Sequence, residues 1–326
     1  MLPVTGSTAS AGNVGLSLVI PCYNEGKVLP FLKQRLLSSL PSLKLSWEVI
    51  LVDDGSRDDT LLQLAAMHAA DPRFKVISFS RNFGHQIALC AGLFHARGDL
   101  VAILDADLQD PPEFIATCLA KINEGYDVVY AVRRQRKEIF YKRACYAMFY
   151  RLLKFIAEVE IPLDSGDFCL MRQRVVVVMR SMPERSVFVR GLRAWSGFRQ
   201  TGVEYNRASR VAGETKYPLH KLVRLAMDGM FAFSAFPLRL ATYLGLAILA
   251  LSFGSLIFLL LWRICNFQLF SHYPSEVPGW TSMICLILFI GGIQLLILGV
   301  MGEFIGRIYN EVKQRPRWII RETLGL

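Results

Sequence analysis

The sequence predicts an α/β fold, a mostly parallel sheet covered by helices, followed by two helices that cross a membrane. The first part rests on short apolar runs that alternate with stretches of helical periodicity between residues 16 and 132, which is the pattern of consecutive βαβ units. The second part rests on two runs without a formal charge, 240–262 and 277–302. Each run is longer than the roughly 20 residues that a helix needs to cross a bilayer.

The predicted elements follow one another in a regular order. We expect strands near 16–20, 48–53, 74–80, 100–105 and 127–132, and helices near 25–40, 58–70, 85–97 and 112–124. After them come an amphipathic region at 138–159, a polar turn at 164–168, a helix near 173–182 and a basic segment that ends at Arg210. Residues 1–14 are rich in Gly, Ser, Thr and Ala and are expected to form a disordered tail, which places the α/β domain at 15–214.

The rest of the chain predicts a membrane anchor. Residues 215–236 mix charged and apolar side chains at near-helical spacing and are interpreted as amphipathic juxtamembrane helices. The transmembrane helices are placed at 237–264 and 277–306, and a basic tail with Trp318 at the membrane interface at 307–326. Lys and Arg concentrate outside the two helices and are sparse in the loop between them. By the positive-inside rule both termini are cytoplasmic, which predicts a multi-pass protein of the cytoplasmic membrane.

Charge and composition limit the partners. The chain has 37 Lys and Arg residues against 27 Asp and Glu, a formal net charge of +10, and most of the surplus lies at 172–221 and in the tail, where it would face anionic lipid or phosphate. No helix-turn-helix, zinc-finger or RNP signature accompanies this charge, which argues against nucleic acid as a partner. The seven cysteines are scattered without a C-x-x-C pair, and there are only five histidines, so neither a disulfide framework nor a zinc site is predicted.

Asp105-Ala106-Asp107 is the most informative motif. It follows Leu100–Leu104, an apolar run expected to be a buried strand, and open α/β sheets bind ligands at the carboxyl ends of their strands. Buried carboxylates are costly unless they are paired or bind a cation, and oxygen ligands suit Mg²⁺ or Mn²⁺. A turn that uses Asp as a capping residue is the alternative interpretation.

Two further polar motifs close predicted strands. Pro21–Glu25 follows the first strand and Asp53–Ser56 follows the second. Taken singly, each could be ordinary local structure, a helix start at Asn24 and Glu25 and a tight turn at Asp53–Ser56. Taken with the acidic motif after the fourth strand, they place groups suited to a nucleotide at one edge of the sheet.

These motifs resemble those of glycosyltransferase family 2, whose members have the GT-A fold. The resemblance covers almost the whole chain and extends to the polyprenyl-phosphate glycosyltransferases, among them bactoprenol glucosyltransferase and dolichol-phosphate mannose synthase. The matching segments are Pro21–Glu25, Asp53–Ser56, Arg81–Gly84, Asp105–Pro112, Ser165–Phe168 and Gly213–Tyr217. The resemblance implies a cytosolic GT-A catalytic domain. It also implies inverting transfer of a single hexose from a nucleotide sugar to polyprenyl (undecaprenyl) phosphate.

The resemblance also implies a donor site. Asp105, Asp107 and Gln109 would bind a divalent ion, Mg²⁺ or Mn²⁺, on the donor diphosphate, and Asp107 would count among the catalytic residues. Such an ion neutralises the negative charge that the departing nucleoside diphosphate gains. The other donor-binding residues would be Pro21, Tyr23, Glu25 and Asp53 around the nucleoside and Arg133 at a phosphate.

For the acceptor phosphate we expect the cations Arg207, Arg210 and Lys216, because Arg and Lys match phosphate oxygens. The resemblance makes Asp167 the first candidate, and Asp164 the second, for the residue described as the base of this family. The alternative for Asp167 is structural, with a carboxylate that caps a turn and organises Arg172.

The sugar and the reaction class have alternatives. Phe188–Gly197 resembles the R-G-L-x-x-W segment of the bactoprenol glucosyltransferase branch. This favours UDP-glucose, with GDP-mannose or another UDP-sugar second. Gln314–Trp318 fits the Q-x-x-R-W pattern of processive polysaccharide synthases, but two membrane helices cannot readily enclose a channel for a polar chain. A non-catalytic scaffold would have no use for the acidic cluster. The resemblance further implies a homo-oligomer, a tetramer.

Overall fold

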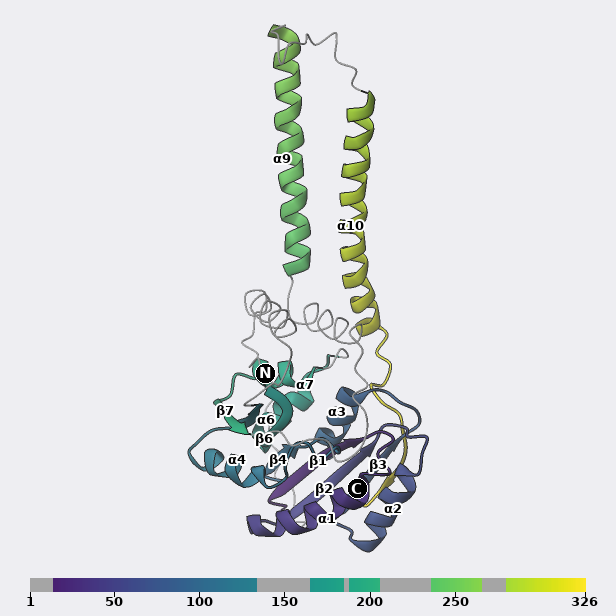
Figure 1. The fold of residues 1–326 in the computed structure, drawn as a ribbon, viewed down its shortest axis with the longest axis vertical. Coiled ribbons are helices and arrows are strands. Elements are labelled where there is room, and N and C mark those ends of the chain that lie inside the picture. The colour runs from purple at the N-terminus through teal and green to yellow at the C-terminus, as the bar shows by residue number, and fades with distance from the viewer. Residues whose placement is uncertain (1–13, 134–164, 185–187, 206–235, 266–279) are drawn as a thin grey trace. The chain divides into compact units, whose positions relative to one another are not determined.

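The computed structural model describes residues 14–133, 165–184, 188–205, 236–265 and 280–326 (Figure 1). The chain divides into two compact units, Met1–Val223 together with Arg315–Leu326, and Arg224–Gln314. Residues 1–13 of the predicted tail, the amphipathic region 138–159 and all but the last residue of the predicted juxtamembrane helices lie outside the described residues.

One eight-stranded sheet organises the first unit. Its spatial order is β7-β5-β6-β4-β1-β2-β3-β8. The strands β1 to β4 are parallel, β5 and β7 run in the same direction, and β6 and β8 run against them. The bounds are β1 (Leu16–Cys22), β2 (Trp47–Asp53), β3 (Phe74–Phe79), β4 (Leu100–Ile103), β5 (Val128–Arg133), β6 (Ser165–Arg172), β7 (Gln200–Tyr205) and β8 (Ile320–Leu324). The mostly parallel sheet of the prediction is confirmed.

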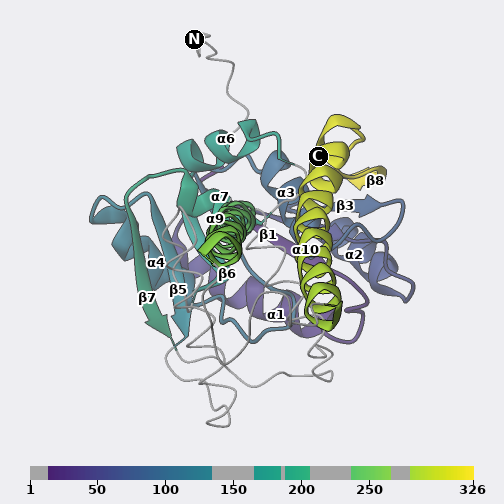
Figure 2. The same ribbon diagram turned by 90° about the horizontal axis from the view of Figure 1, so that it is seen from above.

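Helices cover both faces of the sheet. One face carries α1 (Leu29–Ser39) with a 3₁₀ turn (Leu40–Leu43), α2 (Thr60–Ala70) and α4 (Phe114–Asn123). The other face carries α3 (His85–His95), α6 (Gln173–Ser181) and α7 (Val189–Trp195). Figure 2 shows α3 and α6 on the side of β1 opposite to α1. The β1 strand is buried along its whole length, as expected for a central strand of a parallel sheet.

Two predicted boundaries at the first strand are wrong. β1 runs to Cys22, past Pro21. Its pairing with β4 already ends at Val19, so the missing N–H of Pro21 does not remove a hydrogen bond to β4. The first helix begins at Leu29 and not near residue 25. Pro30 is favoured in the first turn of a helix, whereas Asn24 has a φ of 55° and belongs to the loop.

The predicted polar turn at 164–168 is also wrong from its second residue onward. Ser165 begins β6, which pairs with β4 on one side and β5 on the other. Ser, Gly and Asp are poor strand formers, so the local pattern favoured a turn, but pairing with β5 extends β6 back to Ser165. The predicted basic segment likewise contains a helix, α7, and a strand, β7.

The C-terminal tail contributes the edge strand β8. Ile320–Leu324 pairs antiparallel with β3, and Figure 1 shows this yellow segment beside β3. The side chain of Trp318, which the sequence predicted at a membrane interface, packs against the apolar cluster under α3, edge to face with Phe94 at 6.1 Å. Arg317 adds a hydrogen bond from Nη2 to the Met182 carbonyl at 2.5 Å. The part of the basic tail after residue 314 therefore belongs to the α/β unit.

The second unit contains two long helices, α9 (Phe236–Cys265) and α10 (Trp280–Val312). Within the described part of the chain, one stretch, Phe289–Val312, is long and apolar enough to cross a membrane by length and composition. The α9 helix covers the first predicted transmembrane helix, and the existence of two membrane spans stays a prediction.

We expect the packing of Trp318 to hold the tail on the sheet. Trp318→Ala should lower the thermal unfolding midpoint in detergent by about 4–8 °C, since a partly buried Trp contributes less than the ~3–5 kcal/mol of a fully buried one. Ile319→Ala is the matched control, because its side chain is 53% exposed. Equal effects of the two substitutions would contradict the assignment.

Candidate active site

The predicted motifs meet at the carboxyl edge of the parallel strands. Cys22 at the end of β1 lies opposite Asp53 at the end of β2, and Val19 of β1 pairs with Ile103 at the end of β4. The residues that follow, 23–25, 54–56 and 104–109, therefore emerge at one edge, as the sequence predicts. The antiparallel β6 starts at the same edge, and the pairing of Ile103 with Cys169 brings Asp167 alongside Asp105.

The loops after β1 and β2 are bonded to each other. The Asn24 N–H donates to Ser56 Oγ at 3.0 Å, and the Arg57 N–H donates to Asn24 Oδ1 at 2.9 Å. The Glu25 N–H donates to Thr60 Oγ1 at 2.9 Å. The Asn-Glu pair thus joins two loops of the candidate site and does not start a helix.

Two adjacent carboxylates have separate partners. Asp53 is 1% exposed and accepts hydrogen bonds from the Ser56 N–H at 3.1 Å and from Ser78 Oγ at 2.9 Å. Asp54 accepts from the N–H groups of Phe83 at 2.7 Å and Gly84 at 2.9 Å. The second set fixes the loop that leads into α3, which explains the Arg81–Gly84 motif structurally.

Gly55 allows these loops to touch. Its φ is +66°, and an added Cβ would lie 2.4 Å from the carbonyl carbon of Arg81 and 2.7 Å from the Asn82 nitrogen. A left-handed φ already disfavours other residues, and here the backbone of the neighbouring loop also fills the space. The turn at 53–56 and the loop at 81–84 are consequently one packed unit.

The acidic motif after β4 contains two buried oxygen atoms that accept no hydrogen bond in the described structure. Asp105 Oδ1 and Gln109 Oε1 are both buried and have no hydrogen-bond partner in the described structure, whereas Asp107 Oδ1 accepts from the Gln109 N–H at 3.1 Å. Burial raises the pKa of the Asp105 carboxyl to about 6, and the carboxylates of Asp167 and Asp107 add to the rise. Buried acceptors of this kind require a cation or a donor.

This donor set fits a divalent cation that shares its coordination with a substrate. Across the described ranges, no group of three or more His, Cys, Asp or Glu side chains is placed to hold a metal ion. Mg²⁺ in such sites is bound by one or two carboxylates together with phosphate oxygens and water. Asp105, Asp107 and the amide oxygen of Gln109 match that pattern.

Asp167 lies at the centre of a second cluster. Its carboxylate accepts from Arg190 through Nε at 2.7 Å and Nη2 at 3.2 Å, and from Gln86 Nε2 at 3.2 Å. His85 Nε2 lies 3.4 Å from Asp167 Oδ2 and 3.7 Å from Asp105 Oδ1, and so stands between the two clusters. Burial alone would raise the pKa of Asp167, but Arg190 and His85 hold it well below its usual range.

The sequence analysis missed His85, Gln86 and Arg190 as site residues. His85 and Gln86 directly follow the Arg81–Gly84 motif, and Arg190 lies in the segment that was used only to choose the sugar. The suggested pairing of Asp167 with Arg172 is wrong. Arg172 stands at the opposite end of β6, where it donates to the carbonyls of Ile122 and Tyr126.

Several predicted residues lie outside the description. Asp164, Arg207, Arg210 and Lys216 are not among the described residues, and for Arg133 the backbone alone is described, at the end of β5. The predictions for these residues stay predictions. Pro21 and Tyr23 do stand at the candidate edge, and the Tyr23 ring is 43% exposed there.

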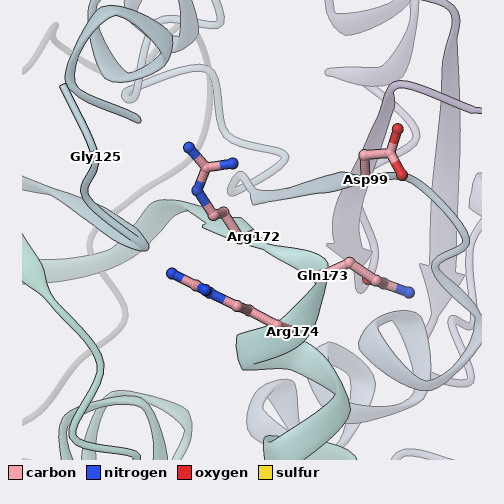
Figure 3. A pocket seen from close by; sticks show the side chains of 5 residues that line it. All are labelled: Asp99, Gly125, Arg172, Gln173 and Arg174. Carbon is pink, nitrogen blue, oxygen red and sulfur yellow. The ribbon is translucent and has the colours of Figure 1, made fainter. Parts of the chain in front are cut away.

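A surface pocket occurs at the other edge of the sheet (Figure 3). Its lining residues are Asp99, Gly125, Arg172, Gln173 and Arg174. Asp99 precedes β4, and Arg172 ends the antiparallel β6, so this pocket lies at the amino ends of the parallel strands and is separate from the candidate site. Arg174 there forms an ion pair with Asp127.

Comparison with known proteins places these motifs in a family. Residues 17–178 match the sequence model of Glycosyl transferase family 2. An uncharacterized glycosyltransferase of Bacillus subtilis, YkcC, is 47% identical over 315 residues, 96% of this chain and 95% of that protein. The SfII prophage-derived bactoprenol glucosyl transferase of Shigella flexneri is 40% identical over 311 residues, 94% of this chain and 98% of that protein.

Among solved structures, glucosyl-3-phosphoglycerate synthase from Mycobacterium tuberculosis, in complex with Mn²⁺, UDP and glucosyl-3-phosphoglycerate, is 20% identical. The match has a TM-score of 0.45 and covers 68% of this chain and 78% of that one.

We expect Gly55→Ala to destabilise the protein more than the same substitution at another candidate-site glycine with a positive φ. Gly84→Ala is the matched control, because Gly84 also has a positive φ, +105°, but nothing lies within 4 Å of an added Cβ. Both variants carry about 1–3 kcal/mol of backbone strain, and Gly55→Ala adds the clash with residues 81 and 82. Its thermal midpoint should therefore be the lower of the two; equal midpoints would contradict this packing.

Proposed function

Because this chain belongs to glycosyl transferase family 2, we propose that it transfers a single hexose, with inversion, from a nucleotide sugar to polyprenyl phosphate. The chain is a glycosyltransferase, and its 40% identity to bactoprenol glucosyl transferases along nearly the whole length supports glucose as the sugar and a polyprenyl phosphate as the acceptor. The observation that carries the proposal is the pair of buried oxygens of Asp105 and Gln109 that accept no hydrogen bond within the described residues, at the edge where the other motifs meet.

UDP-glucose is the proposed donor, with GDP-mannose or another UDP-sugar as the alternative. Asp53 would bind the base or ribose of the nucleoside. Its carboxylate offers about four lone-pair sites, and the bonds from Ser56 and Ser78 use two of them. Pro21, Glu25 and the exposed ring of Tyr23 would line the same pocket, and Arg133 would contact a donor phosphate.

The proposed cofactor is Mg²⁺ or Mn²⁺, held by Asp105, Asp107 and Gln109. When bound, the ion neutralises charge on the donor diphosphate as it departs. The chain's own part is to keep these three oxygen donors close together on one short turn, in which Leu108 adopts a φ of 58°. Asp110, which follows these donors, accepts a hydrogen bond from the Tyr205 hydroxyl and so ties the turn to the end of β7.

The acceptor chemistry needs little proton transfer. A phosphate monoester has a second pKa of about 6, so its attacking oxygen is largely ionised at neutral pH. That oxygen forms a bond to the anomeric carbon while the bond from this carbon to the diphosphate oxygen breaks on the opposite face, which inverts the configuration. Arg207, Arg210 and Lys216 are the proposed cations for this phosphate.

The membrane setting follows from the same proposal. A polyprenyl phosphate keeps its chain in the bilayer, so the reaction requires a membrane-associated enzyme. Membrane helices at 237–264 and 277–306, with both termini in the cytoplasm, would place the transfer at the cytoplasmic face. We further propose a homo-oligomer, a tetramer, as the assembled form.

A panel of radiolabelled nucleotide sugars tests the function. With polyprenyl phosphate and Mg²⁺ or Mn²⁺, label from UDP-glucose should appear in the organic-soluble lipid fraction and be released by mild acid. If label enters the lipid fraction from GDP-mannose and from no other nucleotide sugar, GDP-mannose is the donor in place of UDP-glucose. Absence of lipid-linked label with every donor would refute the proposed reaction.

The metal site is tested by Asp107→Asn. We expect the variant to retain its fold and to lose at least about 100-fold in kcat, the scale for removing an electrostatically stabilising group. We expect Mn²⁺ together with UDP to raise the thermal midpoint of the wild type and to have no such effect on the variant. Asp99→Asn is the charge-matched control at the opposite edge; near-normal turnover of Asp107→Asn would end the metal hypothesis.

A further inference from the structure

We propose that Arg190 binds the acceptor phosphate, and that Asp167 and Gln86 are its positioning residues. The proposal rests on the proposed function, because it assumes a phosphate acceptor. It assigns to Asp167 a role other than that of a base and adds two residues that the sequence analysis did not select.

The hydrogen bonds of Asp167 leave little capacity for a substrate proton. A carboxylate has about four lone-pair sites. Arg190 supplies two donors, Gln86 supplies a third, and His85 Nε2 lies 3.4 Å away. The side chain is only 6% exposed. A carboxylate enclosed by these groups is well placed to hold cations and poorly placed to take up a proton.

The acceptor also has little need of a proton acceptor. Its phosphate already carries about −1.5 to −2 charges at neutral pH. The obstacle is electrostatic, because this anion must approach an edge that holds Asp105, Asp107 and the donor diphosphate. A fixed cation at that edge lowers the cost of bringing the two anions together.

Arg190 meets the requirements for such a cation. It contacts Asp167, which is beside Asp105 in the sheet, and its side chain is 32% exposed and so accessible to a ligand. A guanidinium has five donors in a rigid plane and can bridge a carboxylate and a phosphate. The bidentate bond to Asp167 fixes that plane, which reduces the entropy lost on binding the phosphate.

Gln86 fixes both members of the pair. Its Nε2 donates to Asp167, and its Oε1 accepts from the Val189 N–H at 2.8 Å. Val189 is the first residue of α7, and Arg190 follows it directly. One amide of α3 therefore sets the position of the start of α7 and of the carboxylate that Arg190 contacts.

A similar pair elsewhere in the domain supplies the matched control. Arg174 forms an ion pair with Asp127, which is 4% exposed, at the opposite edge of the sheet. Figure 3 shows Arg174 beside Arg172 at that edge. Arg174→Ala thus removes an Arg–Asp pair of the same chemistry without touching the candidate site.

Steady-state kinetics with the full-length protein in detergent, varying lipid phosphate and nucleotide sugar in turn, test the binding role. Arg190→Ala should raise the KM for the lipid about 10- to 100-fold, the range for a charged hydrogen bond, with the donor KM changed less than about 3-fold. Arg190→Lys, which keeps the charge without the bidentate geometry, should fall between Ala and wild type. Arg174→Ala should leave both KM values unchanged.

The positioning roles have their own readout. Asp167→Asn should raise the lipid KM in the wild-type background but add less than about 3-fold in the Arg190→Ala background, because residues that act through one another are not additive. Gln86→Glu keeps the acceptor for Val189 but replaces the donor to Asp167 with an anion. It should raise the lipid KM less than Arg190→Ala does.

If Asp167 is a base, Asp167→Asn will lower kcat by a similar factor in both backgrounds and leave the lipid KM unchanged, which overturns the proposal. Should Arg190→Ala fold poorly because it leaves a buried charge unpaired, the Arg190→Lys variant and the Arg190→Ala/Asp167→Asn double variant carry the test. Wild-type protein that forms no lipid-linked sugar refutes the proposed function. Wild-type activity with an unchanged lipid KM in the Arg190 variants refutes this inference alone.

Discussion

Compensation of buried negative charge is the constraint on which the candidate site depends. Asp53, Asp54, Asp105 and Asp167 collect at one edge of the sheet, and each needs a partner because an unpaired buried charge is costly. Hydroxyl and backbone N–H groups serve Asp53 and Asp54, and a guanidinium serves Asp167. The buried Asp105 oxygen receives no hydrogen bond from the described structure. That difference separates the carboxylates that build the edge from the one that is left for a cation.

The sequence predicted those parts of the fold that local patterns determine. The strands β1 to β4 are mostly apolar and rich in Val, Ile and Leu. Such runs, alternating with helical periodicity, specify a parallel sheet with little reference to distant residues. The edge could be predicted for the same reason. Once the strands are parallel, residues that directly follow them must meet, so the motifs after β1, β2 and β4 were brought together by topology alone.

The rest depended on contacts between distant segments. Ser165–Asp167 is poor strand sequence and becomes part of β6 because Ser165 pairs with Val132 of β5 and the rest of β6 lies between β4 and β5. Arg190 meets Asp167 across 23 residues, and Gln86 meets it across 81. No periodicity or spacing encodes such pairs. The tail strand β8 was missed for a similar reason, since five mostly polar residues become a strand only when the edge of β3 is present as a template.

The same network gives the edge a physical means of coordinating the two anionic ligands that we propose for it. Asp54 fixes the loop before α3, and α3 carries His85 and Gln86, which contact Asp167. The donor-side loops and the Arg190 cation are therefore attached to one helix end. Displacement of that helix end would disturb both the proposed nucleoside site and the cation proposed for the acceptor. A rigid connection of this kind suits a reaction in which two polyanions must be held within bonding distance. In such a reaction the main contribution of the protein is the precise placement of opposite charges, and proton transfer is secondary.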